Sequence, residues 1–424
     1  MFSPSRLTLL ALAFASSSLA ASAFHRAPNN APGAGAAYFI IDDPAQKLVA
    51  VSIAADGTLG SARVFSAGGK GLRANHVTPP GKPASLFSPG PDPLFTQNSV
   101  QVNAQAKVLV TVNPGSNTVS LFSIDAEDPT KLTQVGKAVP SGGEFPESVT
   151  INSKGTTACV LNGGAVNGVN CFAIHPTVGL VPKPNTLRLL HVNQTTPPSG
   201  PLGSLSTIAF SPDDSKLIAT VKAVDLTAAG NGFLAAWSVG PDGSLSQNFT
   251  KSVPTNSPSL PFTLVPIPGT NAYFSADPGL GFLTADFGSS TSLKATTNAT
   301  SIDNQVLNCW ASWSPKSGNY YLSDLGTSVI TEVQVDKMLN ANIVKQYQLN
   351  ENGGALDNHV ATVGNNAFLY VMAPLAPAIT VLSVNQAGNA MPVQTFNLTT
   401  ALKNAGLTGY NNLNFQGMVS FIKA

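Results

Sequence analysis

The stretch SVTINSKGTTACVLNGGAVNGVNCFAI (148–174) decides the fold, because it is one copy of a unit that recurs along the chain. The unit reads as a short strand, a polar turn, an apolar strand, a turn of small residues, a second apolar strand, an acidic or Gly turn and a last strand. Five further complete copies begin at Ser99, Ser206, Phe262, Trp310 and His359. The copies recur roughly every 46 to 64 residues, and four short strands at such a spacing are typical of a propeller blade.

A seventh copy is partial. The segment AYFIIDDPAQKLVAVSIAADGTLGSARVFSAG (37–68) supplies three strands but lacks the first one of the unit. The C-terminal stretch FQGMVSF (415–421) resembles that missing strand. We therefore predict an all-β, seven-bladed β-propeller over residues 37–424, closed when the C-terminal strand joins the N-terminal blade, which leaves no open sheet edge in the ring.

Two segments interrupt the repeats. Residues 67–97 are rich in Gly and Pro and separate the first two blades. A loop of this length within a domain is usually functional or mobile, and we expect it over one face of the ring. Residues 337–345 carry a weak helical pattern, as do residues 400–405, so each could form a short helical turn.

Composition excludes several classes of function. Lys and Arg number 22 and Asp and Glu number 21, so the net charge is +1, and only 10% of residues are charged. A nucleic-acid binder needs a basic face, which this chain lacks. The hydrophobic content of 43% argues against disorder. The five arginines are scattered along the chain: Arg6, Arg26, Arg63, Arg73 and Arg188.

The N-terminal segment predicts secretion. Residues 1–23 hold a positive residue, a short apolar run and a cleavage-like Ala-Ser-Ala, so we expect a signal peptide followed by a lead-in over 24–36. No later run reaches the length of a membrane span. Four glycosylation sequons fit an extracellular or wall-associated protein: Asn193, Asn248, Asn298 and Asn397.

The three cysteines leave alternatives open. Cys159 and Cys171 flank a hairpin-like segment and could form a disulfide across neighbouring strands, although two buried thiols explain the sequence nearly as well. Cys309 adjoins Trp310 and is interpreted as a packing residue.

The inner strands of a propeller face its central channel, so their first residues should surround one opening. Alignment of the copies on the apolar residue before the turn predicts a ring of seven residues there: Met418, Ser99, Ser148, Thr207, Phe262, Trp310 and His359. An apolar wall with a few polar groups is typical of a small-molecule site. His359 is the titratable member, so it is either an acid–base group or a histidine held by hydrogen bonds.

Loop residues could reach the same face. Arg73 and His76 lie in the insertion and could bind a carboxylate, or they are a solvated pair. Glu144 and Glu147 could be a pair of carboxylates for acid–base work, or two exposed glutamates. We find no metal-ligand spacing and no cofactor motif, so we expect neither a metal nor a cofactor.

The repeats resemble the seven-bladed lactonase propellers, a family that includes 6-phosphogluconolactonase and carboxy-cis,cis-muconate cyclase. The similarity is greatest to the secreted fungal branch known as 3-carboxymuconate cyclase-like. The motifs that carry it are GGKG (68–71), VTVNPGSNTVSLFSID (110–125), GGEFPESV (142–149), CVLNGGAVNGVNCF (159–172) and CWASWSPKSGNYYLSDLG (309–326).

The resemblance implies a cofactor-independent cycloisomerase in which a muconate carboxylate adds across an alkene to give a lactone. Such chemistry uses cationic groups and a general acid, and the family pattern implies a His, a Glu and two Arg at the channel mouth. His359, Glu147, Arg73 and His76 are the candidates. The chain departs from the pattern at Pro146-Glu147-Ser148, where lactonase blades read Pro-Arg-His.

Two classes of function therefore remain. One is an enzyme that acts on a muconate or lactone. The other is a propeller without catalysis that binds a small aromatic or carboxylate ligand or a cell-wall glycan, as an adhesin does. In both cases we expect a monomer with no nucleic-acid partner.

Overall fold

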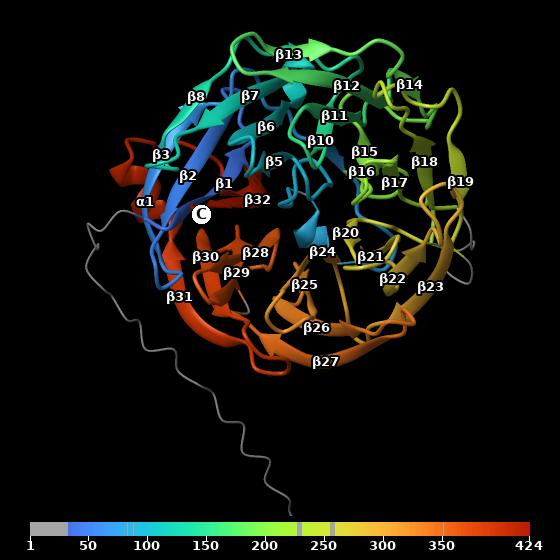
Figure 1. The fold of residues 1–424 in the computed structure, drawn as a ribbon. Helices are drawn as coiled ribbons and strands as arrows, with labels where there is room; N and C mark the ends of the chain where they lie inside the picture. The colour runs from blue at the N-terminus through green and yellow to red at the C-terminus, as the bar shows by residue number, and fades with distance from the viewer. Residues whose placement is uncertain (1–32, 83, 88, 227–230, 255–258, 351) are drawn as a thin grey trace, which may run out of the picture.

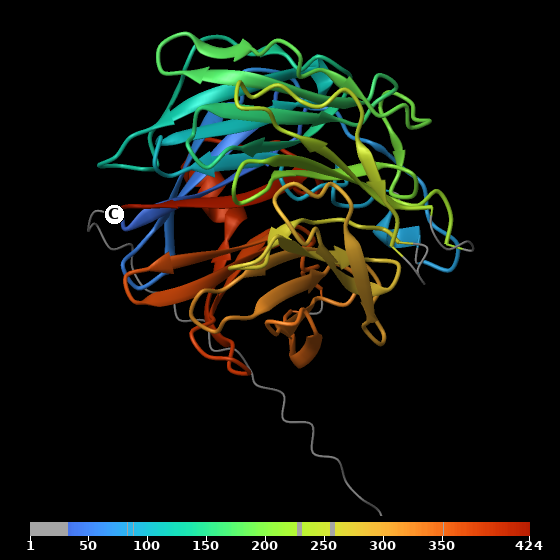
Figure 2. The same ribbon diagram turned by 45° about the vertical axis from the view of Figure 1, so that its right-hand side comes forward.

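The computed structural model describes residues 33–424 except 83, 88, 227–230, 255–258 and 351. The predicted signal peptide (1–23) and most of the lead-in lie outside these residues. Seven sheets stand around a common axis, and the chain passes through them in sequence order (Figures 1 and 2). The predicted seven-bladed propeller is confirmed.

The ring closes as predicted. The last strand, β32 (Phe415–Ile422), is the innermost strand of the first blade and pairs antiparallel with β1 (Gly35–Ile41). Figure 1 shows β1, in blue, beside β32, in red. The other strands of this blade are β2 (Lys47–Ile53) and β3 (Leu59–Ser66).

The remaining blades keep the same order from the axis outward. Blade 2 holds β5 (Val100–Asn103), β6 (Val108–Asn113), β7 (Thr118–Ile124), β8 (Leu132–Gln134) and β9 (Val139–Pro140). Blade 3 holds β10 (Pro146–Ile151), β11 (Thr157–Asn162), β12 (Gly168–His175), β13 (Gly179–Pro182) and β14 (Arg188–Leu189). Blade 4 holds β16 (Leu205–Phe210), β17 (Lys216–Val221), β18 (Phe233–Ser238) and β19 (Thr250–Ser252).

Blades 5 to 7 complete the ring. Blade 5 holds β20 (Val265–Pro266), β21 (Ala272–Asp277), β22 (Gly281–Asp286) and β23 (Thr296–Ser301). Blade 6 holds β24 (Asn308–Trp313), β25 (Tyr320–Asp324), β26 (Val329–Val335) and β27 (Ala341–Gln348). Blade 7 holds β28 (Asn358–Val363), β29 (Asn366–Ala373), β30 (Ala378–Ser383) and β31 (Met391–Asn397).

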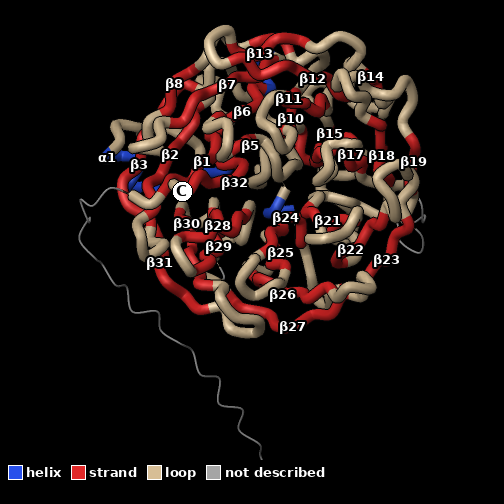
Figure 3. The backbone as a smooth tube through the Cα atoms, viewed as in Figure 1, coloured by secondary structure: helices blue, strands red, loops and turns tan. Residues whose placement is uncertain are grey.

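Helix is scarce in the described residues (Figure 3). It comprises α1 (Leu398–Asn404) and the 3-10 turns η1 (Ala84–Leu86), η2 (Pro114–Ser116) and η3 (Asn412–Asn414). The helical turn predicted at 400–405 falls on α1, whereas the one predicted at 337–345 was wrong, because β27 occupies most of that segment. No helix in the described part of the chain is long and apolar enough to cross a bilayer.

The core lies between the blades. The inner strands of a blade are buried on both faces, so they read as mostly apolar runs; β17 (KLIATV), the second strand of blade 4, is buried along its whole length. The outermost strands are largely exposed, and β27 is accessible along nearly its whole length. This gradient explains why the inner three strands of each copy stand out in the sequence and the fourth does not.

The insertion between blades 1 and 2 lies at one opening of the channel, here called the mouth. Its short strand β4 (Asn75–His76) pairs in parallel with β15 (Ser199–Gly200), in the connection between blades 3 and 4. Its last residues, 94–97, run into the channel. We call these four residues the axial plug.

The axial plug bonds to inner strands from several blades. Thr96 donates its hydroxyl to the Ser206 carbonyl in blade 4, and its own carbonyl accepts from Gln416 in blade 1. Gln97 donates to the carbonyls of Ala311 (2.9 Å) and Asn358 (3.3 Å), in blades 6 and 7. The insertion therefore closes the channel as well as covering its mouth.

Candidate functional site

Bulges at the mouth end of the inner strands set the direction of several side chains. In blade 3, Pro146 and Ser148 have partners in β11 and Glu147 between them has none. In blade 6, Asn308 and Trp310 have partners and Cys309 has none. A bulge bends its strand and redirects a side chain. Glu147 and Cys309 consequently depart from the strict alternation of a regular strand.

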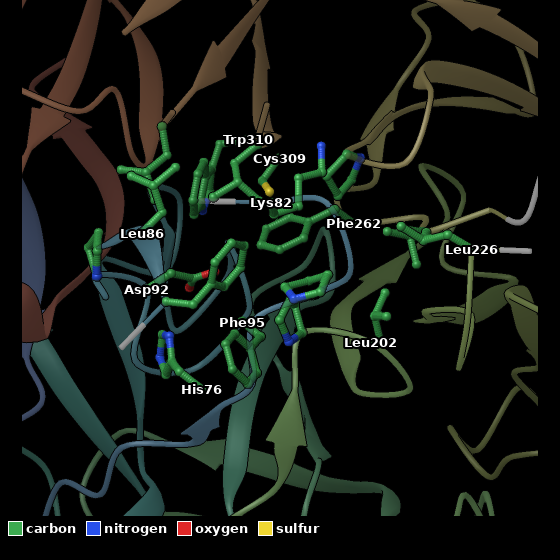
Figure 4. Close-up of a pocket in the computed structure, with 18 residues that line it drawn as sticks. His76, Lys82, Leu86, Asp92, Phe95, Leu202, Leu226, Phe262, Cys309 and Trp310 are labelled. Atoms are coloured by element: carbon green, nitrogen blue, oxygen red, sulfur yellow. The ribbon is translucent and has the colours of Figure 1, made fainter. Parts of the chain in front are cut away.

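The pocket lies between the insertion and blades 4 to 6. Four aromatic rings belong to its lining: Phe87, Phe95, Phe262 and Trp310. In Figure 4, Trp310, Cys309 and Phe262 lie on one side and His76 and Phe95 on the opposite side, with Asp92 between them. The Phe262 and Trp310 rings meet edge to face at 5.2 Å. The wall is therefore mostly apolar and aromatic.

Asp92 is the carboxylate in this lining. Its side chain is only 6% exposed, and Oδ1 has no hydrogen-bond partner among the described residues. Burial raises the pKa of Asp92 above its usual value, and the positive charge of Lys222 opposes that rise. A buried carboxylate with a free oxygen beside an apolar cavity is a candidate functional group.

Lys222 lies behind the aromatic wall and follows directly after β17. It is fully buried, and its Nζ donates to the carbonyls of Phe95 (2.9 Å) and Leu205 (2.6 Å). The same Nζ lies 4.8 Å from the centre of the Phe262 ring, a cation–π distance. Burial lowers the pKa of Lys222, while the charges of Glu147 and Asp92 raise it.

Glu147 is completely buried, and neither carboxylate oxygen has a hydrogen-bond partner among the described residues. Its carboxylate lies against Gly163, where a Cβ would come within 2.1 Å of Oε2. Burial raises the pKa of Glu147 well above its usual value, with Lys222 opposing. Glu144 is directed elsewhere and accepts a hydrogen bond from Thr196. The two glutamates therefore form neither an acid–base pair nor an exposed pair.

The structure brings Arg73 and His76 together. Arg73 Nη2 lies 3.5 Å from His76 Nε2. The guanidinium also donates to the Leu413 carbonyl at 2.9 Å and to Asn414 and the Gly90 carbonyl. These bonds tie the insertion to the segment before β32. Arg73 does not line the pocket.

His76 does line the pocket. Its ring packs on Phe95 at a centroid distance of 4.7 Å. Burial, together with the Arg73 charge, lowers the pKa of His76 to about 3. The imidazole is therefore neutral at physiological pH and belongs to the wall rather than to a charged carboxylate site.

Only part of the predicted ring of mouth residues lines the pocket. Phe262 and Trp310 line the pocket. Four others are buried outside the lining: Ser99, Ser148, Thr207 and Met418. His359 also lies outside it; the residue is partly buried, and this burial lowers its pKa to about 4. The axial plug occupies the centre around which these residues were expected to meet.

The sequon asparagines and the cysteines bear on the remaining predictions. The four sequon asparagines, Asn193, Asn248, Asn298 and Asn397, are all exposed. Cys159 and Cys171 are joined by a disulfide between β11 and β12, with an S–S distance of 1.99 Å. Cys309 is a free, buried thiol that lines the pocket.

Sequence reasoning missed Asp92 and Lys222. Asp92 lies in the Pro-rich part of the insertion, which has no counterpart in other blades. Lys222 carried a usable signal, because it is a lone charge within the apolar run LIATVKAV. A lysine in such a position is rarely buried without a partner. That rule would have directed attention to the carboxylates of the neighbouring blades.

A ring of seven blades around a common axis defines the class as a seven-bladed β-propeller. No protein-family model matches the chain, and no curated protein matches its sequence. Similar solved structures include three propellers described as gluconolactonases or putative 6-phosphogluconolactonases, and at identities of 12–15% the likeness shows the fold alone.

These three structures illustrate the likeness. The periplasmic gluconolactonase of Pseudomonas aeruginosa has a TM-score of 0.63 at 12% identity, covering 92% of this chain and 99% of that one. A protein from Bacteroides fragilis described as a putative 6-phosphogluconolactonase has a TM-score of 0.60 at 12% identity, with the same coverage. Another with that description, from Bacteroides uniformis, has a TM-score of 0.59 at 15% identity, covering 86% of this chain and 96% of that one.

Proposed function

We propose that the pocket is the active site of a lactonase-type propeller and that its substrate is a small lactone without negative charge. The observation that carries this proposal is the free Oδ1 of buried Asp92 in an aromatic wall. The lactonase-like fold of the similar structures agrees with it.

The residues present suit hydrolysis by general base catalysis. Asp92 Oδ1 would accept a proton from water as that water attacks the lactone carbonyl. Lys82 also lines the pocket, and its Nζ uses one donor on the Val306 carbonyl at 2.7 Å. Its remaining donors can face the oxygen that becomes negative. The ring C–O bond then breaks, the ring oxygen takes the proton, and a hydroxy acid leaves.

Charge argues against a carboxymuconate, the finer expectation from sequence. Such a substrate brings several carboxylates to a site that already holds Asp92 and lies close to Glu147. The described arginines are engaged elsewhere: Arg63 with Asp128, Arg73 as above, and Arg188 with backbone carbonyls. Lys82 is the one lysine or arginine among the lining residues.

The test compares substrates and variants. Purified protein is given an uncharged lactone, with proton release as the readout, and separately carboxymuconate, with ultraviolet absorbance as the readout. We expect turnover of the lactone, a loss of about 10²-fold or more in Asp92→Asn, and little change in Asp303→Asn, an exposed control. Lys82→Met is compared with exposed Lys137→Met. Turnover of carboxymuconate, or of lactone by Asp92→Asn at the wild-type rate, contradicts the proposal.

A binding module without catalysis is the second candidate. The aromatic rings that line the pocket offer faces on which an aromatic ligand or a sugar ring of a wall glycan can pack. Binding of a lactone or aromatic probe without any turnover favours this candidate. Trp310→Ala should then weaken the binding, because it removes the largest ring of the wall.

We also propose that the mature chain is secreted and glycosylated. The signal-like residues 1–23 and the four exposed sequon asparagines support this. Expression of the full sequence in a eukaryotic host should release protein into the medium, and a glycosidase should lower its mass. Protein retained in the cells at an unchanged mass contradicts the proposal.

A further inference from the structure

Lys222 connects the two walls of the pocket. Its Nζ is 2.9 Å from the carbonyl oxygen of Phe95 and 4.8 Å from the ring centre of Phe262. Both aromatic side chains line the pocket. Phe95 belongs to the axial plug, so Lys222 and Ser206, which donates to the same carbonyl at 2.9 Å, attach the plug to blade 4. One ammonium group thus contacts both an inserted segment and a blade.

Lys222 and Asp92 belong to one buried cluster around Phe95: the Asp92 carboxylate accepts a hydrogen bond from the Phe95 backbone amide, and Lys222 Nζ donates to the Phe95 carbonyl. The Lys222 charge acts on Asp92 from the insertion and on Glu147 from β10. The Asp92 carboxylate also accepts hydrogen bonds from Gln416 of β32 and from the backbone amides of Phe95 and Thr96. Four further titratable side chains interact with it electrostatically, namely Arg73, Asp357, Glu147 and Cys309. His76 contacts the Asp92 backbone. Arg73 already donates to three acceptors away from Asp92, and Lys82, which lines the pocket, donates to the Val306 carbonyl. Lys222 is the cation whose charge opposes the rise of the Asp92 pKa.

We propose that Lys222 is a positioning residue of the pocket: its ammonium group fixes the Phe95 wall, and its charge decides whether Asp92 meets the ligand as a carboxylate or as a carboxylic acid. The consequence for a ligand rests on the proposed function, whereas the consequence for Asp92 can be measured without a ligand. Without Lys222, the neighbouring carboxyl groups and the apolar wall would all disfavour a charged Asp92.

The two roles are separated by substitution. Lys222→Met removes both the charge and the donor to Phe95. Lys222→Gln removes the charge and keeps an amide donor, whereas Lys222→Arg keeps the charge. Glu147→Gln removes the other carboxylate that interacts with the Lys222 charge, so Asp92 becomes the main carboxylate near Lys222. This variant is a control in which the pKa of Asp92 should not rise.

The experiment follows the ¹³C signal of the Asp92 carboxyl through a pH titration of ligand-free protein, with Asp92→Asn to assign the signal. In Lys222→Met and Lys222→Gln we expect the midpoint to rise by about one pH unit or more, the size of effect that a close opposite charge has on a carboxylate. In Lys222→Arg it should stay close to the wild-type value. In Glu147→Gln it should fall or stay unchanged.

The outcomes are distinguishable. A midpoint that does not rise in Lys222→Gln overturns the proposal, as does one that rises equally in Lys222→Arg. If Lys222→Met does not fold, the Gln and Arg variants still decide the question. If the wild-type protein hydrolyses a lactone, the acid limb of the pH–rate profile of each variant should shift by the same amount as its Asp92 titration midpoint. Absence of turnover with the midpoint shift intact rejects the proposed function and retains the role of Lys222.

Discussion

Gln97, the last residue of the axial plug, should contribute measurably to the stability of the ring. The side chain is nearly buried and joins two blades: Nε2 donates to the carbonyls of Ala311 and Asn358, and Oε1 accepts from Ala311 N at 3.2 Å. Gln97→Ala removes all three bonds. It also leaves backbone groups of β24 without their side-chain partner in a buried place.

The size of the effect follows from these contacts. A hydrogen bond contributes about 1 kcal/mol net, so three of them predict a loss of about 3 kcal/mol in the free energy of unfolding. Water that enters the vacated space would reduce the loss to about 2 kcal/mol. Gln97→Glu should cost a similar amount, because an oxygen then faces the two carbonyls that Nε2 served.

The assay is urea unfolding followed by tryptophan fluorescence. Trp310 is a local reporter, since its Nε1 donates to the Thr96 carbonyl of the axial plug at 3.3 Å. Gln101→Ala, at a partly exposed position in the adjacent strand β5, is the matched control and should change stability by less than about 0.5 kcal/mol. Equal losses in the two variants would refute the view that Gln97 holds the axial plug in the channel.

Three further predictions concern ring closure, buried charge and the disulfide. Gly417→Ala should cost about 1–3 kcal/mol more than Gly409→Ala, because both have a positive φ but only the Gly417 Cβ would meet Ser99 Oγ, at 2.5 Å; urea midpoints of the two variants check this. Burial raises the pKa of Asp357, so folding favours its protonated form, and its contribution to stability is present at about pH 4 and lost as the pH rises. Asp357→Asn should therefore gain stability relative to wild type between pH 4 and pH 8, by at least about 1 kcal/mol, while exposed Asp303→Asn should show no such trend. Reduction of Cys159–Cys171 opens a loop with a sequence separation of 12, and should lower the free energy of unfolding by about 3 kcal/mol in a comparison with and without reductant; an unchanged midpoint contradicts it.

The blades could be predicted because each copy repeats the same burial pattern. Strands that are buried on both faces need apolar residues throughout, and short turns of Gly, Asp, Asn and Pro separate them. The fourth strand lacks this signal. β27 is exposed, and its sequence ANIVKQYQ therefore reads as well for a helix as for a strand. Pairing with β26, which the sequence does not display, decides between them.

The site was predicted less well, for two physical reasons. The alignment assumed strict alternation of side chains, and the bulges at Glu147 and Cys309 break that alternation where the strands reach the mouth. The insertion, in addition, has no repeat against which to align it. Phe95 and Asp92 therefore offered no pattern, although both line the pocket.

The position of the pocket follows from the geometry of a closed ring. Seven inner strands leave a hole on the axis, and their first residues carry polar atoms that need partners there. Residues 94–97 supply those partners from a separate segment, so the blades maintain the ring while the insertion shapes the site. Phe95 shows the division: its carbonyl bonds to Ser206 and Lys222 of blade 4, and its ring forms the wall with His76. Substitutions in the outer strands should consequently lower stability without changing ligand binding. Substitutions near Asp92 and Phe95 should change ligand binding before they change stability.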